Sequence, residues 1–155
     1  MSFLLPISIA LILLDQASKL AVLRYLPVYS GKTIVPGFFN LVHVRNTGSA
    51  FSLLAGADAS WRLPFFIITT LIIVGVILFA YSKTSRDDYW AKTAYTLIVG
   101  GAVGNLIDRL RFGEVVDFLD FYIQSYHWPA FNVADSAITV GALMLFFSIL
   151  RTRDG

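Results

Sequence analysis

Two aspartates in this sequence have the type and setting needed for general acid-base chemistry. Asp117 stands in the run Val-Val-Asp-Phe, and Asp135 opens a long apolar segment. Two carboxyls a few ångströms apart cannot both ionise cheaply, so such a pair holds one proton across neutral pH. The ionised member can then deprotonate a water while the protonated member donates to a carbonyl. If the fold brings them together, this pair could hydrolyse a peptide bond without a metal or a nucleophilic side chain.

A second explanation covers one of these aspartates. Asn132 stands three residues before Asp135 and directly before an apolar run, which is the signature of a helix N-terminus. The residues alone therefore leave Asn132 and Asp135 open between helix capping and a role in a site. Asp117 has no comparable local explanation.

Further charged residues interrupt apolar segments. Asp15 and Lys19 are four residues apart, so on a helix they share a face and can form a buried ion pair that orients the helix. Ser18 beside Lys19 also raises a serine-lysine nucleophile, although adjacent helical residues point in different directions. Asn105 and Arg109 are likewise four apart, and either a snorkelling Arg with a local amide bond or a site role explains them.

The elements that must position these residues are membrane helices. Of all residues, 57% are hydrophobic and 14% are charged, and the mean hydropathy is +0.71. About 20 apolar residues cross a bilayer core. We therefore expect an all-α polytopic membrane protein whose four transmembrane helices cover residues 2–23, 63–81, 91–110 and 133–150. An even number of spans puts both termini on one side, but the Lys and Arg counts do not decide which side.

Smaller elements are expected between the helices. Phe38–Val44 is rich in aromatic and β-branched residues and ends at a turn signal, which predicts a short strand. Ala50–Trp61 fits a short amphipathic interfacial helix, and the segment Phe112–Tyr126 fits a second strand and loop. The remainder of the stretch between Arg24 and Arg62 is expected to be irregular.

Composition also argues against several classes of function. The chain has no cysteine, so it has no disulfide or thiol nucleophile. The two histidines do not form a short-range zinc-binding pair, and we expect neither a metal nor a cofactor. Net charge is +2 with scattered basic residues, so we expect the lipid bilayer and not nucleic acid as a partner. The first apolar stretch lacks a basic n-region and a small-residue cleavage signal, so we expect it to remain in the mature protein.

Five ordered motifs make the chain similar to the lipoprotein signal peptidase, or signal peptidase II, family. They are DQASK at 15–19, NTGSAFS at 46–52, GGAVGNLIDR at 100–109, VVDF at 115–118 and FNVAD at 131–135. Ser18 and Ser49 stand where the family usually has Thr and Ala, and both are small replacements.

The resemblance implies a single membrane-embedded peptidase domain over residues 1–155, placed in the bacterial cytoplasmic membrane with cytoplasmic termini and an active site near the extracytoplasmic face. It implies an intramembrane aspartic endopeptidase that removes signal peptides from diacylglyceryl-modified prolipoproteins, cutting on the N-terminal side of the lipidated cysteine. It implies a small extracytoplasmic β-sheet, and we expect a monomer.

Position by position, the resemblance implies that Asp117 and Asp135 are catalytic. It implies supporting roles for Asn46, Asn105, Arg109 and Asn132, while Asp15 and Lys19 are expected to be structural. Asp120 is then expected to be a surface or loop acid.

Buried charges also mark ion paths, so a small ion-coupled transporter or channel is the main alternative. A noncatalytic membrane scaffold is a further one.

Overall fold

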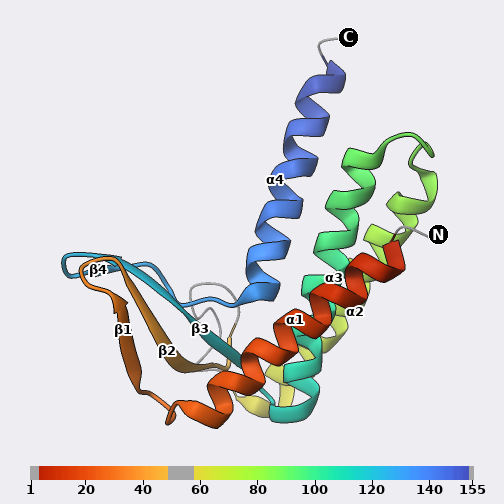
Figure 1. Ribbon diagram of the computed structural model, residues 1–155. Helices are drawn as coiled ribbons and strands as arrows, with labels where there is room; N and C mark the ends of the chain where they lie inside the picture. Colours follow the sequence, from red (N-terminus) through yellow and green to blue (C-terminus); the bar gives the residue numbers. More distant parts are fainter. Residues whose placement is uncertain (1–3, 49–57, 154–155) are drawn as a thin grey trace.

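Four long helices and a four-stranded antiparallel sheet make up the fold (Figure 1). The computed structural model describes residues 4–48 and 58–153. The helices are α1 (Leu4–Tyr25), α2 (Ala59–Lys83), α3 (Tyr89–Phe112) and α4 (Val133–Arg153). Both ends of the described chain and the α2–α3 turn lie at one end of the helices, and the sheet lies at the other. This arrangement agrees with an even number of passes.

The central helix of the group is α3, which packs against α1, α2 and α4. Small residues allow the close approach. A Cβ added to Gly101 would collide with the backbone carbonyl oxygen of Ala134, and one added to Gly141 would lie 2.7 Å from the Ala94 carbonyl oxygen. Because these glycines carry no side chain, the backbones of α3 and α4 come into close contact at the start of α4 and again at Gly141, further along the helix.

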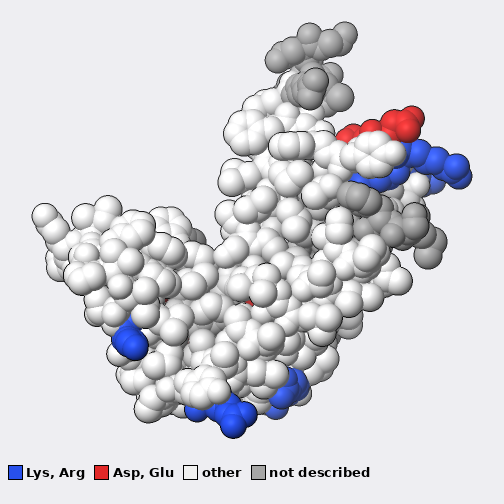
Figure 2. Space-filling view, viewed as in Figure 1, with Lys and Arg blue, Asp and Glu red and all other residues white. Residues whose placement is uncertain are grey.

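The outward faces of α1, α2 and α4 are apolar and exposed. Two helices in the described part of the chain, over Leu5–Tyr25 and Ser60–Lys83, are long and apolar enough to cross a membrane, while the apolar part of α4 is shorter (Val133–Ser148). The helix α3 carries charges that face the other helices. Large exposed apolar residues on α2 include Ile68, Leu71, Ile72, Ile73, Val76 and Phe79. Figure 2 shows a broad uncharged surface, with Lys, Arg and acidic side chains near its two ends. Such a surface suits a hydrocarbon solvent.

The sheet has the order β1-β2-β3-β4, with all neighbours antiparallel. Its strands are β1 (Gly31–Val35), β2 (Phe39–Asn46), β3 (Val115–Ile123) and β4 (Tyr126–His127). A cluster of Val22 from α1 with Val116 and Phe118 from β3 joins the helices to the sheet. The end of β3 that contains Val116 and Phe118 is therefore held against α1, and the other end of this strand projects away from the helices.

Several expectations need correction. The label all-α understates the sheet, because the strand β1 was missed and β2 continues past Val44 to Asn46. The strand β1 is exposed along its whole length, so it lacks the alternation of apolar and polar residues that reveals a half-buried strand. The second span begins earlier than expected, at Ala59. Most of the expected interfacial helix Ala50–Trp61 lies outside the described residues.

Candidate active site

The two aspartates line one groove between the sheet and the helices. Asp117 lies on β3 and is 2% exposed, while Asp135 lies in the first turn of α4. The groove has a volume of about 990 Å³, and both residues line it together with Asn46, Asn105 and Arg109. Figure 2 shows a hollow between the sheet and α4. The fold thus brings together the pair expected from the sequence.

Asn132 connects the two aspartates directly. Its side-chain amide donates to Asp117 Oδ1 over 2.7 Å, and its backbone N–H donates to Asp135 Oδ2 over 3.3 Å. The backbone N–H of Asp135 donates in return to Asn132 Oδ1 over 2.9 Å. The last two bonds form a capping box at the start of α4. The capping explanation is therefore confirmed, and the same Asn132 that caps α4 also bonds Asp117.

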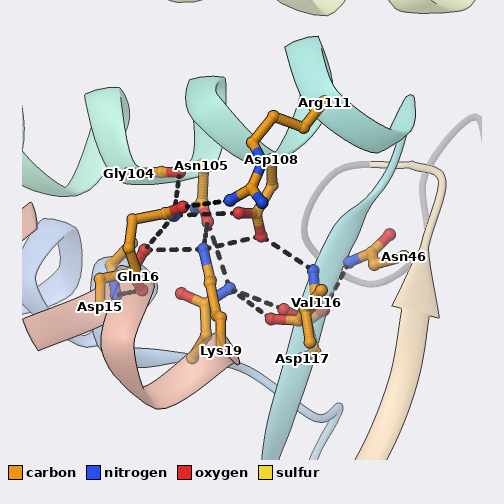
Figure 3. Close-up of polar contacts among 12 residues, drawn as sticks. Asp15, Gln16, Lys19, Asn46, Gly104, Asn105, Asp108, Arg111, Val116 and Asp117 are labelled. Atoms are coloured by element: carbon orange, nitrogen blue, oxygen red, sulfur yellow. Dashed lines mark hydrogen bonds and ion pairs between the residues drawn. The ribbon is translucent and has the colours of Figure 1, made fainter. Parts of the chain in front are cut away.

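Two further asparagines each donate to one aspartate. Asn46 Nδ2 donates to Asp117 Oδ2 over 2.9 Å (Figure 3), and Asn105 Nδ2 donates to Asp135 Oδ1 over 2.7 Å. Each carboxylate therefore accepts two N–H bonds, one on each oxygen. Four donors fix the orientation of the two carboxylates and leave their remaining lone pairs for other partners.

The orientation of all three amides is set by their oxygen atoms. Asn105 Oδ1 accepts from Lys19, Asn132 Oδ1 accepts from the Asp135 backbone, and Asn46 Oδ1 accepts from the Gly48 backbone over 2.9 Å. An ammonium or a backbone N–H can only donate. The oxygen of each amide must face that donor, so each NH₂ group must face an aspartate.

A buried charge cluster lies beneath this layer. Lys19 Nζ lies 2.8 Å from Asp15 Oδ2 and 3.0 Å from Asp108 Oδ2, and Lys19 and both acids are 1% exposed (Figure 3). Asp15 also accepts from the Ala134 backbone, and Asp108 accepts from the Val116 backbone. The predicted Asp15–Lys19 pair is confirmed, and it ties α1 to α3, α4 and β3 next to both aspartates.

Two members of this cluster were missed from the sequence. Asp108 and Gln16 lie within the GGAVGNLIDR and DQASK motifs but were assigned no role, yet Gln16 Nε2 donates to Asp108 Oδ1 over 2.9 Å. Asp108 lies four residues after Gly104 and three after Asn105 on the same helix, so its helical spacing could have revealed it.

Other residues have more limited roles. Arg109 lines the groove, stacks over Phe66 at 4.9 Å and donates to the Gly48 carbonyl over 3.3 Å. Ser18 donates to the Asp15 carbonyl over 2.7 Å, and Lys19 is occupied by two carboxylates, so these two do not form a nucleophilic dyad. In the described ranges, no three His, Cys, Asp or Glu side chains are grouped to hold a metal ion.

The environment of Asp117 alters its acidity. Burial and, to a smaller extent, the nearby charge of Asp135 together raise the pKa of Asp117 from 3.8 to about 7, against the opposing bonds from Asn46 and Asn132. At neutral pH, a substantial fraction of Asp117 therefore carries its proton.

Asp120 differs from its expectation as a surface or loop acid. It lies on β3, is 8% exposed, and is bonded to Asn40 and His127. The error arose because the sequence does not show the neighbouring strands that cover Asp120.

A family model described as Signal peptidase (SPase) II matches residues 7–151. The chain belongs to the signal peptidase II family. It is 49% identical over 152 residues to a lipoprotein signal peptidase of Syntrophotalea carbinolica, covering 98% of this chain and 92% of that protein. It is 52% identical over 141 residues to one of Aeromonas hydrophila, covering 90% and 83%.

A solved structure described as "Bacterial membrane enzyme structure by the in meso method at 2.3 A resolution" has the same fold, with a TM-score of 0.88 and 31% identity over 97% of this chain and 89% of that one. As a member of the signal peptidase II family, the chain is an aspartic peptidase that cleaves the signal peptides of prolipoproteins, and it is a membrane enzyme. The family membership decides against the transporter or channel that the buried charges alone left open.

Proposed function

We propose that Asp117 and Asp135 are the catalytic pair of this peptidase. The observation that carries the proposal is that Asn132 bonds both carboxyls at once. The two groups therefore meet at the wall of a groove large enough for an extended peptide and part of a lipid.

The chemistry follows from the protonation of the pair. Asp117, with its pKa near 7, is the protonated member and donates to the oxygen of the scissile carbonyl. Asp135 is the ionised member and takes a proton from the attacking water. The water oxygen bonds to the carbonyl carbon to give a gem-diol. The carbon–nitrogen bond then breaks as the leaving nitrogen takes the proton from Asp135 and Asp117 takes back the proton of one gem-diol hydroxyl, which leaves a carboxylic acid and an amine.

The surrounding residues hold the pair for this reaction. Asn46, Asn105 and Asn132 keep the carboxyl oxygens oriented, and the Asp15–Lys19–Asp108 cluster holds α1, α3 and α4 around them. Arg109 lies over Phe66 in the same groove, where its charge suits a carbonyl of the substrate backbone.

The substrate class we propose is a prolipoprotein whose cysteine already carries a diacylglyceryl group, cut on the N-terminal side of that cysteine. The groove opens between α2 and α4, where apolar groups from Phe66, Ile73, Ile138 and Val140 line it. Each buried methylene contributes about 0.8 kcal/mol, so acyl chains lying there would set the depth of the scissile bond. No cofactor is required by this scheme.

Topology and assembly complete the proposal. We propose four transmembrane helices in the bacterial cytoplasmic membrane, with the sheet and the active site near the extracytoplasmic face and both termini cytoplasmic. The proposal is supported by the sheet and the groove lying at the opposite end of the helices from both ends of the described chain (Figure 1). We propose a monomer, because one chain supplies both aspartates and all three asparagines.

The test is a cleavage assay with purified protein and two matched precursor peptides. One peptide carries a diacylglyceryl group on its cysteine, and the other has a free thiol. Mass spectrometry should find cleavage before the modified cysteine and little or none in the free-thiol peptide. Equal cleavage of both peptides would contradict the lipid requirement.

Because the chain has no cysteine, orientation can be tested with single cysteines placed at Lys32 or Asp87. In intact cells from which the outer membrane has been removed, a membrane-impermeant thiol reagent should label the first and not the second. The reverse pattern would overturn the topology.

A further inference from the structure

A second polar cluster lies at the outer end of the sheet. His127 Nδ1 lies 2.8 Å from Asp120 Oδ1 and 3.0 Å from Oδ2, and Asn40 Nδ2 donates to Asp120 Oδ2 over 2.8 Å. Tyr122 stacks on the His127 ring at 4.8 Å with an angle of 8°. Asp120 thereby joins β2, β3 and β4 in one contact group.

Asp120 does not face the groove. Residues three apart on a strand point to opposite faces, so Asp120 is on the face opposite to Asp117. The pairing of β2 with β3 agrees with this. Asn40 on β2 is directly opposite Asp120, whereas Asp117 accepts its bond from Asn46, at the other end of β2. Asp120 and its partners Asn40 and His127 are absent from the groove lining. Any effect of Asp120 on the reaction must therefore pass through other residues.

The segment that follows β4 connects this cluster to the active site. Residues 128–131 line the groove and run directly into Asn132. We call these residues the strap. Its backbone is bonded to β3 at both ends, from Trp128 N to Phe121 O over 2.8 Å and from Phe131 N to Leu119 O over 3.1 Å. Phe131 also stacks on Phe121 at 5.8 Å.

The strand β4 is too short to hold the strap in place alone. It consists of two exposed residues, Tyr126 and His127, which form two pairs with β3. Strand pairs of this length are marginal in water. The side-chain bond between His127 and Asp120 is an additional contact that holds the start of the strap on the sheet. The side chain of Asp120 is only 11% exposed in this contact.

We propose that Asp120 is a positioning residue for substrate binding. Together with His127 and Asn40, a group that we call the clamp, it holds the strap against β3, so that the strap forms a fixed wall of the groove beside Asp117. The inference rests on the proposed function, because the strap lines the groove in which the precursor peptide is proposed to bind. Without the clamp, the strap moves away from β3 and the groove loses a fixed wall. The dyad is retained, because Asn132 remains held by Asp117 and Asp135. The clamp therefore acts mainly on KM.

The test is steady-state cleavage of the diacylglyceryl precursor by the full-length protein in detergent. Asp120→Ala and His127→Phe should each raise KM about tenfold or more and change kcat less than about threefold, since both lose the charge-assisted bond between His127 and Asp120 and Asp120→Ala also loses the bond from Asn40. His127→Phe keeps a ring to stack on Tyr122 at a half-exposed site, so it covers the case in which Asp120→Ala fails to fold. Asp120→Asn should stay within about threefold of wild type, because an amide oxygen still accepts from both partners. Asp87→Ala, an exposed acid in the α2–α3 turn, is the matched control.

Two further measurements separate a clamp from general damage. The double variant Asp120→Ala/His127→Phe should be no worse than Asp120→Ala alone, because Asp120→Ala already removes the bond to His127. Backbone amide exchange in residues 126–131 should be faster in Asp120→Ala and unchanged in the helices.

An unchanged KM, additive effects, or a loss confined to kcat would overturn the clamp. If the wild-type protein fails to cut the precursor at all, the proposed function is contradicted. Unaltered amide exchange in the strap of Asp120→Ala would overturn the clamp independently of that result.

Discussion

Lys19 Nζ lies 3.0 Å from Asn105 Oδ1, and this contact decides which end of the Asn105 amide faces Asp135. The ammonium group is held in turn by Asp15 and Asp108. A lysine that does not line the groove therefore controls one of the two donors on a carboxylate of the proposed catalytic pair.

Lys19→Met should lower both stability and activity. It leaves Asp15 and Asp108 buried without their cation, which costs about 3 to 5 kcal/mol, and it frees the Asn105 amide to turn. Thermal unfolding in detergent together with cleavage rates measures both effects. Arg24→Met, at an exposed position near the end of the same helix, is the control. An inactive Lys19→Met protein of unchanged stability would instead indicate a direct catalytic role.

Asp117→Asn and Asp135→Asn should each abolish cleavage in a folded, membrane-inserted protein, because the pair needs one proton donor and one acceptor. Each variant should retain less than about a tenth of the wild-type rate, a loss of at least roughly 1.4 kcal/mol in the barrier. Asp120→Asn is the matched acid-to-amide control on the same strand. If the two dyad variants stayed active while the control was inactive, the choice between Asp117 and Asp120 would have to be reversed.

The raised pKa of Asp117, about 7 against an ordinary 3.8, gives two pH effects. Activity should decline above about pH 7, as Asp117 loses the proton it donates. Between about pH 4 and 7, the unfolded chain binds fewer protons at this residue than the folded chain, so stability should fall as pH rises. Asp117→Asn lacks the titrating carboxyl, so its free energy of unfolding should rise by on the order of 2 to 4 kcal/mol relative to that of wild type across that window. Parallel stability curves for the two proteins, measured by denaturant unfolding, would refute the assignment.

Gly101→Ala should destabilise the protein and reduce cleavage by more than tenfold. The new methyl group would meet the Ala134 carbonyl and the Ile138 side chain, which would force α4 and Asp135 away from α3. Gly75→Ala is an informative control, because nothing lies within 4 Å of its added Cβ, and alanine favours helix. Unfolding temperature and cleavage rate should fall in the first variant only.

Inhibitors should separate the mechanism from its rivals. EDTA, a fluorophosphonate and a thiol reagent should leave cleavage of the diacylglyceryl precursor intact. A lipophilic peptide with a hydroxyl at the scissile position should block it, because the hydroxyl mimics the gem-diol between Asp117 and Asp135. Activity lost to EDTA and restored by added metal would contradict the aspartic mechanism, and labelling of Ser18 would favour a serine nucleophile.

The sequence predicted those parts of the molecule that depend on local spacing. The four helices follow from the length of the apolar segments, the strand around Phe38–Val44 follows from its aromatic and β-branched residues, and the Asp15–Lys19 pair follows from a four-residue separation. The closeness of Asp117 and Asp135 did not follow from their spacing and came from the family resemblance.

Other features depended on contacts that sequence spacing does not show. The spacing of Asp108 from Asn105 places both on one helix face but does not show the bond of Asp108 to Lys19 on another helix, and Asp120 is buried by strands distant in the sequence. The fully exposed strand β1 exists because β2 offers it a pairing edge, so its own residues carry little signal.

The helix α2 stands apart from the polar network that holds the reaction centre. Its groove-lining hydroxyls are used within the helix, since Thr69 and Thr70 donate to the carbonyls of Phe65 and Phe66. This helix therefore shows mostly methyl groups and rings to the groove. In the proposed mechanism, substitutions in α2 change the surface offered to the acyl chains and leave every amide on the aspartates unaltered. The proposed lipid preference and peptide-bond hydrolysis therefore depend on separate parts of the chain, and selection in membranes of different lipid composition can change the first while preserving the second.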